Sequence, residues 1–298
     1  MRIKSSFKTL FALLSAIMVA ACAREDVSSY APIESYPQDK NLQAVSAKRA
    51  MIIVAHDDDM CAITGTASQL NKQGWDIRVL SFYSGEVRAK AHRQACSGIL
   101  DSVMYFDLAH EEFRQDTTTK KYMAIPKERF PEIFNEEAAA VELTEKVNQF
   151  KPAVIFTLDN HMGGYGHPEH TFISQLVVDL ARADSITPKY IYQSVFTDHM
   201  ENTIMARHSE RMKSWGFAGD EWERAKETYG VSGMPEPTVQ VNIASEAEEK
   251  MDYLKSYNER EREILGFFIP AFEEYSAEEY FKIFDREFFR ILAKGEDF

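Results

Sequence analysis

Two short stretches of the sequence combine histidine and carboxylate side chains at spacings that suit metal-assisted hydrolysis. The first is Ala-His-Asp-Asp-Asp-Met at residues 55–60, directly after the apolar run Ala-Met-Ile-Ile-Val at residues 50–54. That run, with its β-branched residues, predicts a strand buried on both faces. Because four titratable groups at the end of a buried strand are costly without a balancing cation, we expect a divalent metal ion here. Imidazole and carboxylate ligands suit zinc.

The second stretch is Gly-Gly-Tyr-Gly-His-Pro-Glu-His at residues 163–170, and it follows another apolar run. His167 stands where a helix N-cap is expected, because Pro168 suits the first helical position. His167 and His170 are three residues apart, so they can share one face of the first helical turn. One of these histidines could bind a metal ion while the other faces a substrate.

Apolar runs alternate along the chain with segments of helical spacing. Strands are expected at about 50–55, 76–83, 103–106, 153–158 and 190–192, and helices at about 62–73, 87–100, 136–150 and 168–183. This alternation is typical of βαβ units with right-handed crossovers. The sequence therefore predicts an α/β fold with a mainly parallel sheet.

In such a sheet, the loops after the first and fourth strands meet at the switch point of the topology. We therefore expect His56, Asp59 and His170 to reach one ion. Two nitrogens, one carboxylate oxygen and water make an open catalytic zinc site. Asp58 would remain beside it, free to act as a base. Two simpler interpretations stay open: Asp59 could only cap a helix that starts near Met60, and His-Pro-Glu-His could only begin a helix.

Four further segments complete the organisation. Long loops at the ligand-binding edge of the sheet are predicted at 109–135 and 201–237. Amphipathic helices are predicted at about 245–264 and 277–292. The second carries Phe281, Phe284, Phe288 and Phe289 at helical spacing, which indicates a stripe that faces the core.

The overall charge limits the class of partner. The 298 residues carry a formal net charge of −13, with 27% charged and 45% hydrophobic residues. This composition is ordinary for a globular protein. The acidic balance gives no electrostatic footprint for nucleic acid and no attraction to an anionic membrane surface.

The N-terminus has the pattern of an export signal. A positive region with Arg2, Lys4 and Lys8 precedes a short apolar region that ends in Val-Ala-Ala-Cys at residues 19–22. Small residues before a cysteine resemble a bacterial lipobox, which predicts a lipoprotein signal peptide over 1–21 and a lipid on Cys22. A plain secretory signal is the alternative. Residues 22–48 would then be a flexible tether and 49–298 the folded domain, held in the bacterial cell envelope through the N-terminal lipid only.

The two stretches resemble the hallmarks of the PIG-L/LmbE-like family of zinc-dependent deacetylases, which are Ala-His-Pro-Asp-Asp-Glu and His-x-Asp-His. The resemblance implies a Rossmann-like, three-layer fold. It also implies that His56, Asp59 and His170 bind Zn²⁺ or another divalent metal.

The same resemblance assigns the catalytic roles. Asp58 would be the general base, His167 the acid and Tyr165 the group that polarises the amide oxygen. Ser-Gly-Glu at residues 84–86 is similar to a family Asp-Gly-Glu segment, so Glu86 and Arg88 are candidate substrate-binding residues.

Four positions depart from the family pattern. Asp57 replaces a proline, Met60 replaces a glutamate, Glu169 replaces an aspartate, and His92 stands about where the family has a glutamate. The loss of the glutamate at Met60 is expected to loosen the orientation of the site.

The function implied is zinc-dependent hydrolysis of the N-acetyl amide of an N-acetylglucosamine-containing glycan or glycoconjugate. Two alternatives are an amidase that acts on a larger amide conjugate and a lipid-anchored glycan-binding protein whose catalytic site has decayed.

Overall fold

A seven-stranded sheet forms the centre of the protein. The computed structural model describes residues 24–116, 118–119 and 123–298. The sheet has the order β3-β2-β1-β4-β5-β7-β6. Its strands are β1 (Arg49–Ile53), β2 (Asp76–Ser81), β3 (Ser102–Tyr105), β4 (Val154–Leu158), β5 (Tyr190–Ser194), β6 (Val239–Asn242) and β7 (Arg286–Ala293). Strands β1 to β5 are parallel, whereas β7 is antiparallel to both β5 and β6. The predicted α/β fold with a mainly parallel sheet is confirmed.

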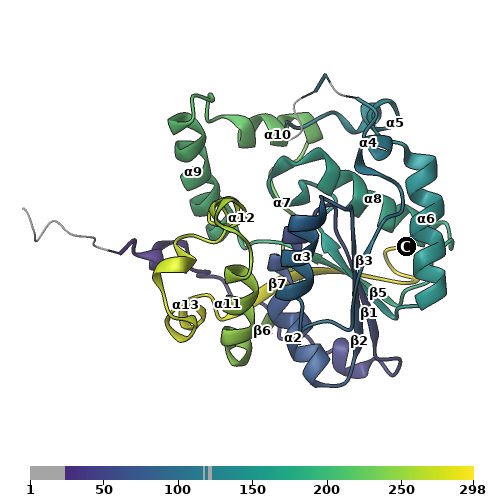
Figure 1. Ribbon diagram of the computed structural model, residues 1–298, viewed down its shortest axis with the longest axis horizontal. Helices are drawn as coiled ribbons and strands as arrows, with labels where there is room; N and C mark the ends of the chain where they lie inside the picture. The colour runs from purple at the N-terminus through teal and green to yellow at the C-terminus, as the bar shows by residue number, and fades with distance from the viewer. Residues whose placement is uncertain (1–23, 117, 120–122) are drawn as a thin grey trace, which may run out of the picture.

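Helices cover both faces of the sheet and give the three layers visible in Figure 1. They are α2 (Thr64–Lys72), α3 (Glu86–Ala95), α4 (His110–Phe113), α5 (Phe130–Ile133), α6 (Glu136–Phe150), α7 (Gly163–Gly166), α8 (Pro168–Arg182), α9 (Asp198–Ser214), α10 (Glu221–Tyr229), α11 (Ala247–Lys255), α12 (Glu259–Leu265) and α13 (Ala277–Ile283). One core lies between the sheet and α2, α3 and α11, and the other lies between the sheet and α6 and α8.

Strand β1, which leads into the first motif, is packed on both of its faces. Ala50 and Ile52 belong to the core under α2 and α11, whereas Met51 and Ile53 belong to the core under α6 and α8. All four side chains are fully buried. Because successive side chains of a strand point to opposite faces, a continuous apolar run fits a strand covered on both sides. The chain therefore leaves β1 from a fixed position.

The predicted helix over 277–292 is wrong in its second half. Helix α13 ends at Ile283, and strand β7 begins at Arg286, so Phe288 and Phe289 lie on a strand. Strand β7 pairs with β5 on one side and β6 on the other. Two ladders of backbone hydrogen bonds outweigh a helical spacing that an aromatic-rich strand also satisfies. The aromatic side chains are nevertheless buried in the core, as predicted.

Two other predicted segments also differ. The expected loop over 201–237 is largely helical, because α9 and α10 fall within it. The expected helix over 245–264 is interrupted between α11 and α12. At this break, the Asn258 side chain accepts hydrogen bonds from the backbone N–H groups of Arg260 and Glu261, which starts a new helix.

The described part of the expected tether, residues 24–48, lies against the domain. Val27, Leu42 and Val45 are buried, and the Tyr275 hydroxyl donates a hydrogen bond to the Glu25 carbonyl at 2.6 Å. Tyr192 on β5 donates to Asp39 Oδ1 at 2.8 Å. The prediction of a flexible tether is therefore corrected for these residues, because scattered apolar side chains fix the segment without any periodic pattern.

The predicted signal peptide, residues 1–21, and Cys22 lie outside the described residues. Within the part of the chain that is described, no helix has both the length and the apolar character needed to cross a membrane.

Candidate metal-binding and catalytic site

The first motif forms a tight turn after β1. The chain enters a 3-10 helix over Asp57–Ala62, and the extended residue His56 precedes it. The backbone N–H of His56 donates to Asp59 Oδ2 at 2.8 Å. Asp59 therefore does stabilise the start of the turn, as the simpler interpretation predicts. Its other oxygen, Oδ1, remains directed at His170 Nε2, 3.2 Å away.

The second motif begins in a loop that the Asp159 side chain holds in place. The Asp159 carboxylate, at the end of β4, accepts hydrogen bonds from the backbone N–H groups of His161, Met162 and Gly164 at 2.7–2.9 Å. Gly163 has φ of +57°, and a Cβ there would lie 2.5 Å from the backbone nitrogen of Thr171. Glycine is required at Gly163, because any side chain would push the loop away from α8.

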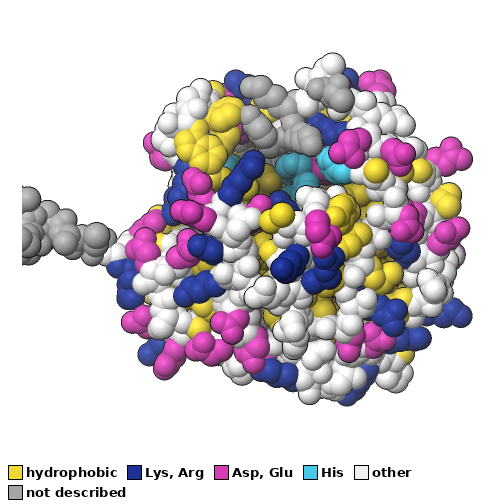
Figure 2. All heavy atoms as spheres, in the orientation of Figure 1, with side chains coloured by type: hydrophobic (Ala, Val, Ile, Leu, Met, Phe, Trp, Pro, Cys, Tyr) yellow, Lys and Arg dark blue, Asp and Glu magenta, His cyan; other side chains and the backbone are white. Residues whose placement is uncertain are grey.

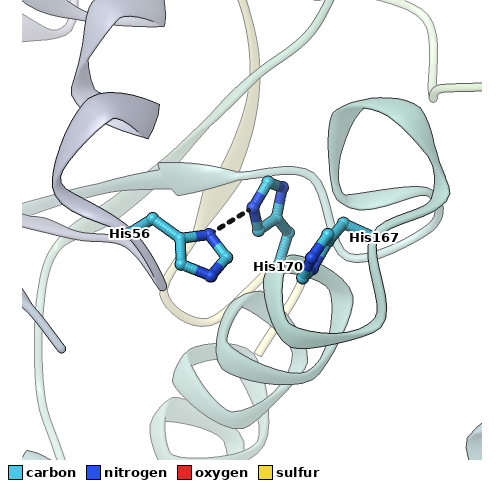
Figure 3. A group of neighbouring side chains, drawn as sticks. All are labelled: His56, His167 and His170. Atoms are coloured by element: carbon cyan, nitrogen blue, oxygen red, sulfur yellow. Dashed lines mark hydrogen bonds between the residues drawn. The ribbon is translucent and has the colours of Figure 1, made fainter. Parts of the chain in front are cut away.

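Three side chains from the two motifs bring their ligand atoms close together. His56 Nδ1 lies 2.9 Å from His170 Nε2 and 3.5 Å from Asp59 Oδ2, and Asp59 Oδ1 is 3.2 Å from His170 Nε2. Figure 3 shows the facing nitrogens of His56 and His170, with the ring of His167 beside them. The structure thus brings together His56, Asp59 and His170, the three predicted metal ligands. We call them the donor cluster.

The outer hydrogen bonds of the two histidines decide which nitrogens carry lone pairs. His170 Nδ1 donates to the Gly163 carbonyl at 2.9 Å, and His56 Nε2 donates to Glu169 Oε2 at 3.0 Å. In the neutral imidazoles, His56 Nδ1 and His170 Nε2 are then lone-pair atoms that face each other and a carboxylate. The lone pairs of the two nitrogens and the carboxylate repel one another unless a cation lies among them. Two imidazole nitrogens and a carboxylate oxygen fit zinc or another divalent metal.

Electrostatics agree with a cation-attracting site. Burial lowers the pKa of His56, but hydrogen bonds with Asp59 and Glu169 outweigh burial and hold that pKa well above its usual value. Burial raises the pKa of Asp59, but the imidazoles of His170 and His56 outweigh burial and hold that pKa below its usual value. Donors that attract a proton also attract a divalent ion, so protons and metal ions would compete for them.

His167 lies next to the donor cluster in a different role. Its ring stacks on that of His170 with centroids 4.4 Å apart, and its Nδ1 accepts a hydrogen bond from the backbone N–H of Glu169 at 3.3 Å. His167 is therefore the N-cap of α8, as predicted. Burial, followed by the charges of His170 and His56, lowers the pKa of His167 well below its usual value. Neutral His167 would present its Nε2–H as a hydrogen-bond donor.

The segment that contains both motifs matches a known family. Residues 51–181 match the family model of PIG-L, described as GlcNAc-PI de-N-acetylase. The predicted family resemblance is confirmed, and the PIG-L segment, residues 51–181, carries every member of the donor cluster.

Several solved structures are similar to this chain at low sequence identity. A deacetylase of the teicoplanin biosynthesis pathway, in complex with teicoplanin, is 10% identical with a TM-score of 0.50, over 83% of this chain and 100% of that chain. An N,N'-diacetylchitobiose deacetylase from Pyrococcus horikoshii is 13% identical with a TM-score of 0.45, over 98% and 95%. A 4-carboxy-2-hydroxymuconate hydratase from Pseudomonas putida KT2440 is 13% identical with a TM-score of 0.47, over 82% and 96%. No curated protein matches the chain in sequence.

Asp58, the base expected from the PIG-L resemblance, has one oxygen engaged and one available. Asp58 Oδ1 accepts a hydrogen bond from Arg88 Nη2, and Arg88 Nε donates to Asp57 Oδ1 at 2.5 Å. Asp58 Oδ2 makes no hydrogen bond with the described residues. Arg88, a candidate substrate-binding residue, is thus paired with two carboxylates of the PIG-L segment and orients Asp58.

Asp57 acquires a partner that a proline could not have. Its side chain is fully buried, and burial raises its pKa to about 6, although the nearby Arg88 guanidinium opposes the rise. The departure from the family proline therefore coincides with the Arg88 ion pair. Glu86, the other candidate substrate-binding residue, points into solvent: its side chain is 73% exposed and pairs with Arg93.

Tyr165 lies beside the donor cluster with its hydroxyl unpaired within the described residues. Its ring stacks on Phe268 with centroids 4.3 Å apart and meets the His170 ring edge-on at 5.3 Å. Burial, followed by the charges of Asp59 and Asp58, raises the pKa of Tyr165 well above its usual value. The hydroxyl therefore stays protonated and can donate a hydrogen bond.

Three residues that support the cluster escaped prediction. Glu169, buried in the first turn of α8, accepts hydrogen bonds from His56 Nε2, from His110 Nε2 at 2.9 Å and from Arg114 Nη1 at 2.7 Å. His110 and Arg114 come from the insertion over 109–135, which was predicted to reach this edge of the sheet. The sequence predicted the loop that carries His110 and Arg114 but not their contacts with Glu169, because their spacing does not resemble that of metal ligands.

The remaining departures are absorbed by packing. Met60 is fully buried against Cys96, and His92 is fully buried with its Nδ1 2.7 Å from the Tyr257 hydroxyl. The glutamate that Met60 replaces was expected to support the site, and here Glu169 gives a carboxylate to His56. Figure 2 shows a hollow in this face of the molecule with histidine side chains at its floor.

Proposed function

We propose that the protein is a metal-dependent hydrolase that removes the N-acyl group, such as acetyl, from an amino sugar in a glycan or glycoconjugate. The observation that carries this proposal is the convergence of His56 Nδ1, the Asp59 carboxylate and His170 Nε2, with outer hydrogen bonds that turn both imidazole lone pairs inward. The family description of the PIG-L segment supports the N-acetylated amino sugar as the substrate class.

The donor cluster would hold Zn²⁺ or another divalent ion. When bound, such an ion polarises an acyl carbonyl and lowers the pKa of water. Asp58 Oδ2, which makes no hydrogen bond within the described residues, would take the proton of the attacking water. Arg88 holds the other oxygen of Asp58 and so fixes its orientation.

Two side chains can stabilise the charge that develops on the carbonyl oxygen. The Tyr165 hydroxyl and the Nε2–H of neutral His167 both lie at the donor cluster, and both can donate hydrogen bonds. Since the pKa of His167 is lowered, we assign the proton that the leaving amine needs to Asp58, which has just received it from water. The C–N bond breaks, and the products are a carboxylic acid and a free amine.

The test combines metal analysis with product detection. We expect the purified protein to retain about one divalent ion per chain and to release amine from N-acetylglucosamine derivatives. Chelation should lower this rate by roughly two or more orders of magnitude, and added zinc should restore it. A protein that binds no divalent metal would contradict the proposal and favour the decayed glycan-binding alternative.

We also propose that the enzyme acts in the bacterial cell envelope, attached by a lipid on Cys22. The Val-Ala-Ala-Cys sequence at residues 19–22 supports this location. Cells that express the protein should incorporate labelled fatty acid into it, and the Cys22→Ser variant should not. Equal labelling of both proteins would contradict the proposal.

A further inference from the structure

A cavity adjoins the donor cluster on the side of the C-terminal part of the chain. It measures about 160 Å³, and its lining includes Asp59, His170 and Tyr165. The rest of the wall comes mostly from apolar side chains on α9, on α13 and on the segments that follow β5 and α12, among them Phe196, Met200, Ile204, Met205, Phe268 and Phe281. Helices α9, α12 and α13 lie together on the left of Figure 1. We call this space the acyl cavity.

Apart from the Tyr165 hydroxyl at the end near the donor cluster, the main polar groups in the wall are already paired with the protein. Lys250 Nζ contacts Glu287 Oε1, and the Glu287 carboxylate also accepts hydrogen bonds from the backbone N–H groups of Gly65 and Thr66 at 2.9 and 2.8 Å. The Tyr280 hydroxyl donates to the Pro270 carbonyl at 3.0 Å. A sugar ring in this space would lose hydrogen bonds to water and find few partners, which is costly. The cavity therefore suits an apolar group.

The position of the cavity decides which part of an amide substrate would enter it. A carbonyl oxygen beside the donor cluster and the Tyr165 hydroxyl has Asp59 and His170 on one side, and these two residues also line the cavity. The neighbours of the cluster that do not line the cavity include the polar residues Glu169, His110 and Arg114. The acyl carbon chain would enter the cavity while the hydroxyl-rich amine part stays in the open hollow of Figure 2.

The size of the cavity exceeds what an acetyl group needs. A cavity of roughly 150 Å³ with an apolar lining accommodates a benzene molecule in another protein. An acetyl group would contribute one methyl and leave most of the 160 Å³ empty. A void of this kind forfeits the contacts of its lining, so a longer group should bind more tightly.

We propose that the enzyme prefers amides whose acyl group is apolar and of medium length, about six carbons, over N-acetyl amides. This inference rests on the proposed function and names the acyl side of its substrate. Hydrolysis breaks the same C–N bond, the water oxygen becomes part of a medium-chain carboxylate, and the amine takes the proton.

Substrates that differ only in the acyl chain test the preference. Amine release from N-acetyl-, N-butyryl- and N-hexanoylglucosamine is measured with the metal-loaded enzyme. Since each of the four additional methylenes contributes about a fourfold gain, kcat/KM should rise roughly 250-fold from acetyl to hexanoyl. Equal or faster turnover of the acetyl compound would overturn the inference and leave the proposed function intact. No turnover of any member would defeat the proposed function, and the inference with it.

Two substitutions should move the preference in opposite directions. Ile204→Phe reduces the space in the cavity and should lower the hexanoyl-to-acetyl ratio of kcat/KM at least tenfold. Met205→Ala enlarges the space and should shift the optimum to longer chains. Val141→Phe, at a half-exposed position of α6 in the other helical layer, is the control and should leave the ratio unchanged. Equal ratios in all four proteins would overturn the inference.

A binding measurement gives a readout that does not depend on turnover. Calorimetric titration of the Asp58→Asn variant should show N-hexanoylglucosamine binding roughly 250-fold more tightly than N-acetylglucosamine. Equal affinities would overturn the inference even if both compounds bind.

Discussion

The PIG-L segment and the C-terminal part of the chain, residues 194–293, build opposite sides of one site by different means. The PIG-L segment supplies charged and polar side chains, each fixed by a specific partner, such as Glu169 for His56 or Arg88 for Asp58. The C-terminal part supplies mostly apolar walls whose members have neighbours but few directed bonds. Hydrogen bonds and ion pairs fix the positions of reacting atoms closely, whereas apolar walls discriminate between substrate groups by their size. The chemistry and the selectivity of the site are therefore expected to respond to different mutations.

The largest effect is expected at Asp58, on the chemical side of this comparison. Asp58→Asn keeps the shape and the Arg88 contact but removes the base, so turnover of every substrate should fall about 10²- to 10⁴-fold. Metal content, measured by mass spectrometry, should stay the same. Asp107→Asn is the matched control, because the Asp107 side chain is 90% exposed. A variant with undiminished turnover would show that Asp58 is not the base.

On the C-terminal side, Phe289→Ala should affect stability. Phe289 on β7 is fully buried, and loss of its ring should lower the free energy of unfolding by about 3–5 kcal/mol. Urea denaturation measures this loss, and Val141→Ala at a half-exposed site should change the free energy by about 0.5 kcal/mol or less. The folded fraction should still bind metal with unchanged affinity. A lower affinity in folded Phe289→Ala protein would break the proposed separation of the two parts.

A smaller effect on the chemical side is expected at Glu169. Glu169→Gln retains the volume but weakens the hydrogen bond that orients His56, so metal affinity should fall about 10- to 100-fold. Competition with a chromophoric chelator measures the affinity. Glu132→Gln serves as control, because the Glu132 side chain is 65% exposed and forms an ion pair with Arg129 on the surface. Unchanged affinity would mean that His56 is oriented by its ring contacts alone.

The smallest effect concerns a bond that joins the two parts. His92 in the PIG-L segment bonds Tyr257 of the C-terminal part, and burial lowers its pKa to about 3. The unfolded chain then binds more protons than the folded protein below the ordinary pKa of about 6.5, so stability falls with falling pH. Between pH 7 and pH 5 the loss from His92 should be about 2 kcal/mol. His92→Gln should remove that part of the pH dependence in urea denaturation, and an unchanged slope would exclude His92 as its source.

The sequence predicts the parts of the fold that repeat local patterns. Strand β1 was predicted from its continuous apolar run, and helix α6 from its run of residues that favour helices. The donor cluster also follows, since the ends of β1 and β4 must meet in a parallel sheet. These inferences need only the order of the elements.

Features that depend on the path of a loop or on a distant partner were not predictable. The Glu169–His110 contact joins residues that the chain separates by an irregular insertion, and nothing in either local sequence specifies the other. The prediction for the residues of β7 was wrong for a related reason. Their aromatic side chains fit both a helical and an extended pattern, and the pairing with the edge of β5 favours the strand. The roles of Asp57 and Arg88 were missed because an ion pair needs the positions of both elements.

The position of β7 between β5 and β6 has a consequence for the biosynthesis of the protein. Strands β1 to β5 can pair in the order in which they leave the ribosome, but β6 has its ladder in the described residues only with β7, which is made later. Until β7 has been synthesised, β6 has no strand to pair with, and the part of the cavity wall that α13 and β7 supply cannot form. During synthesis, the donor cluster would thus be able to form before the cavity that is proposed to select the acyl group is complete.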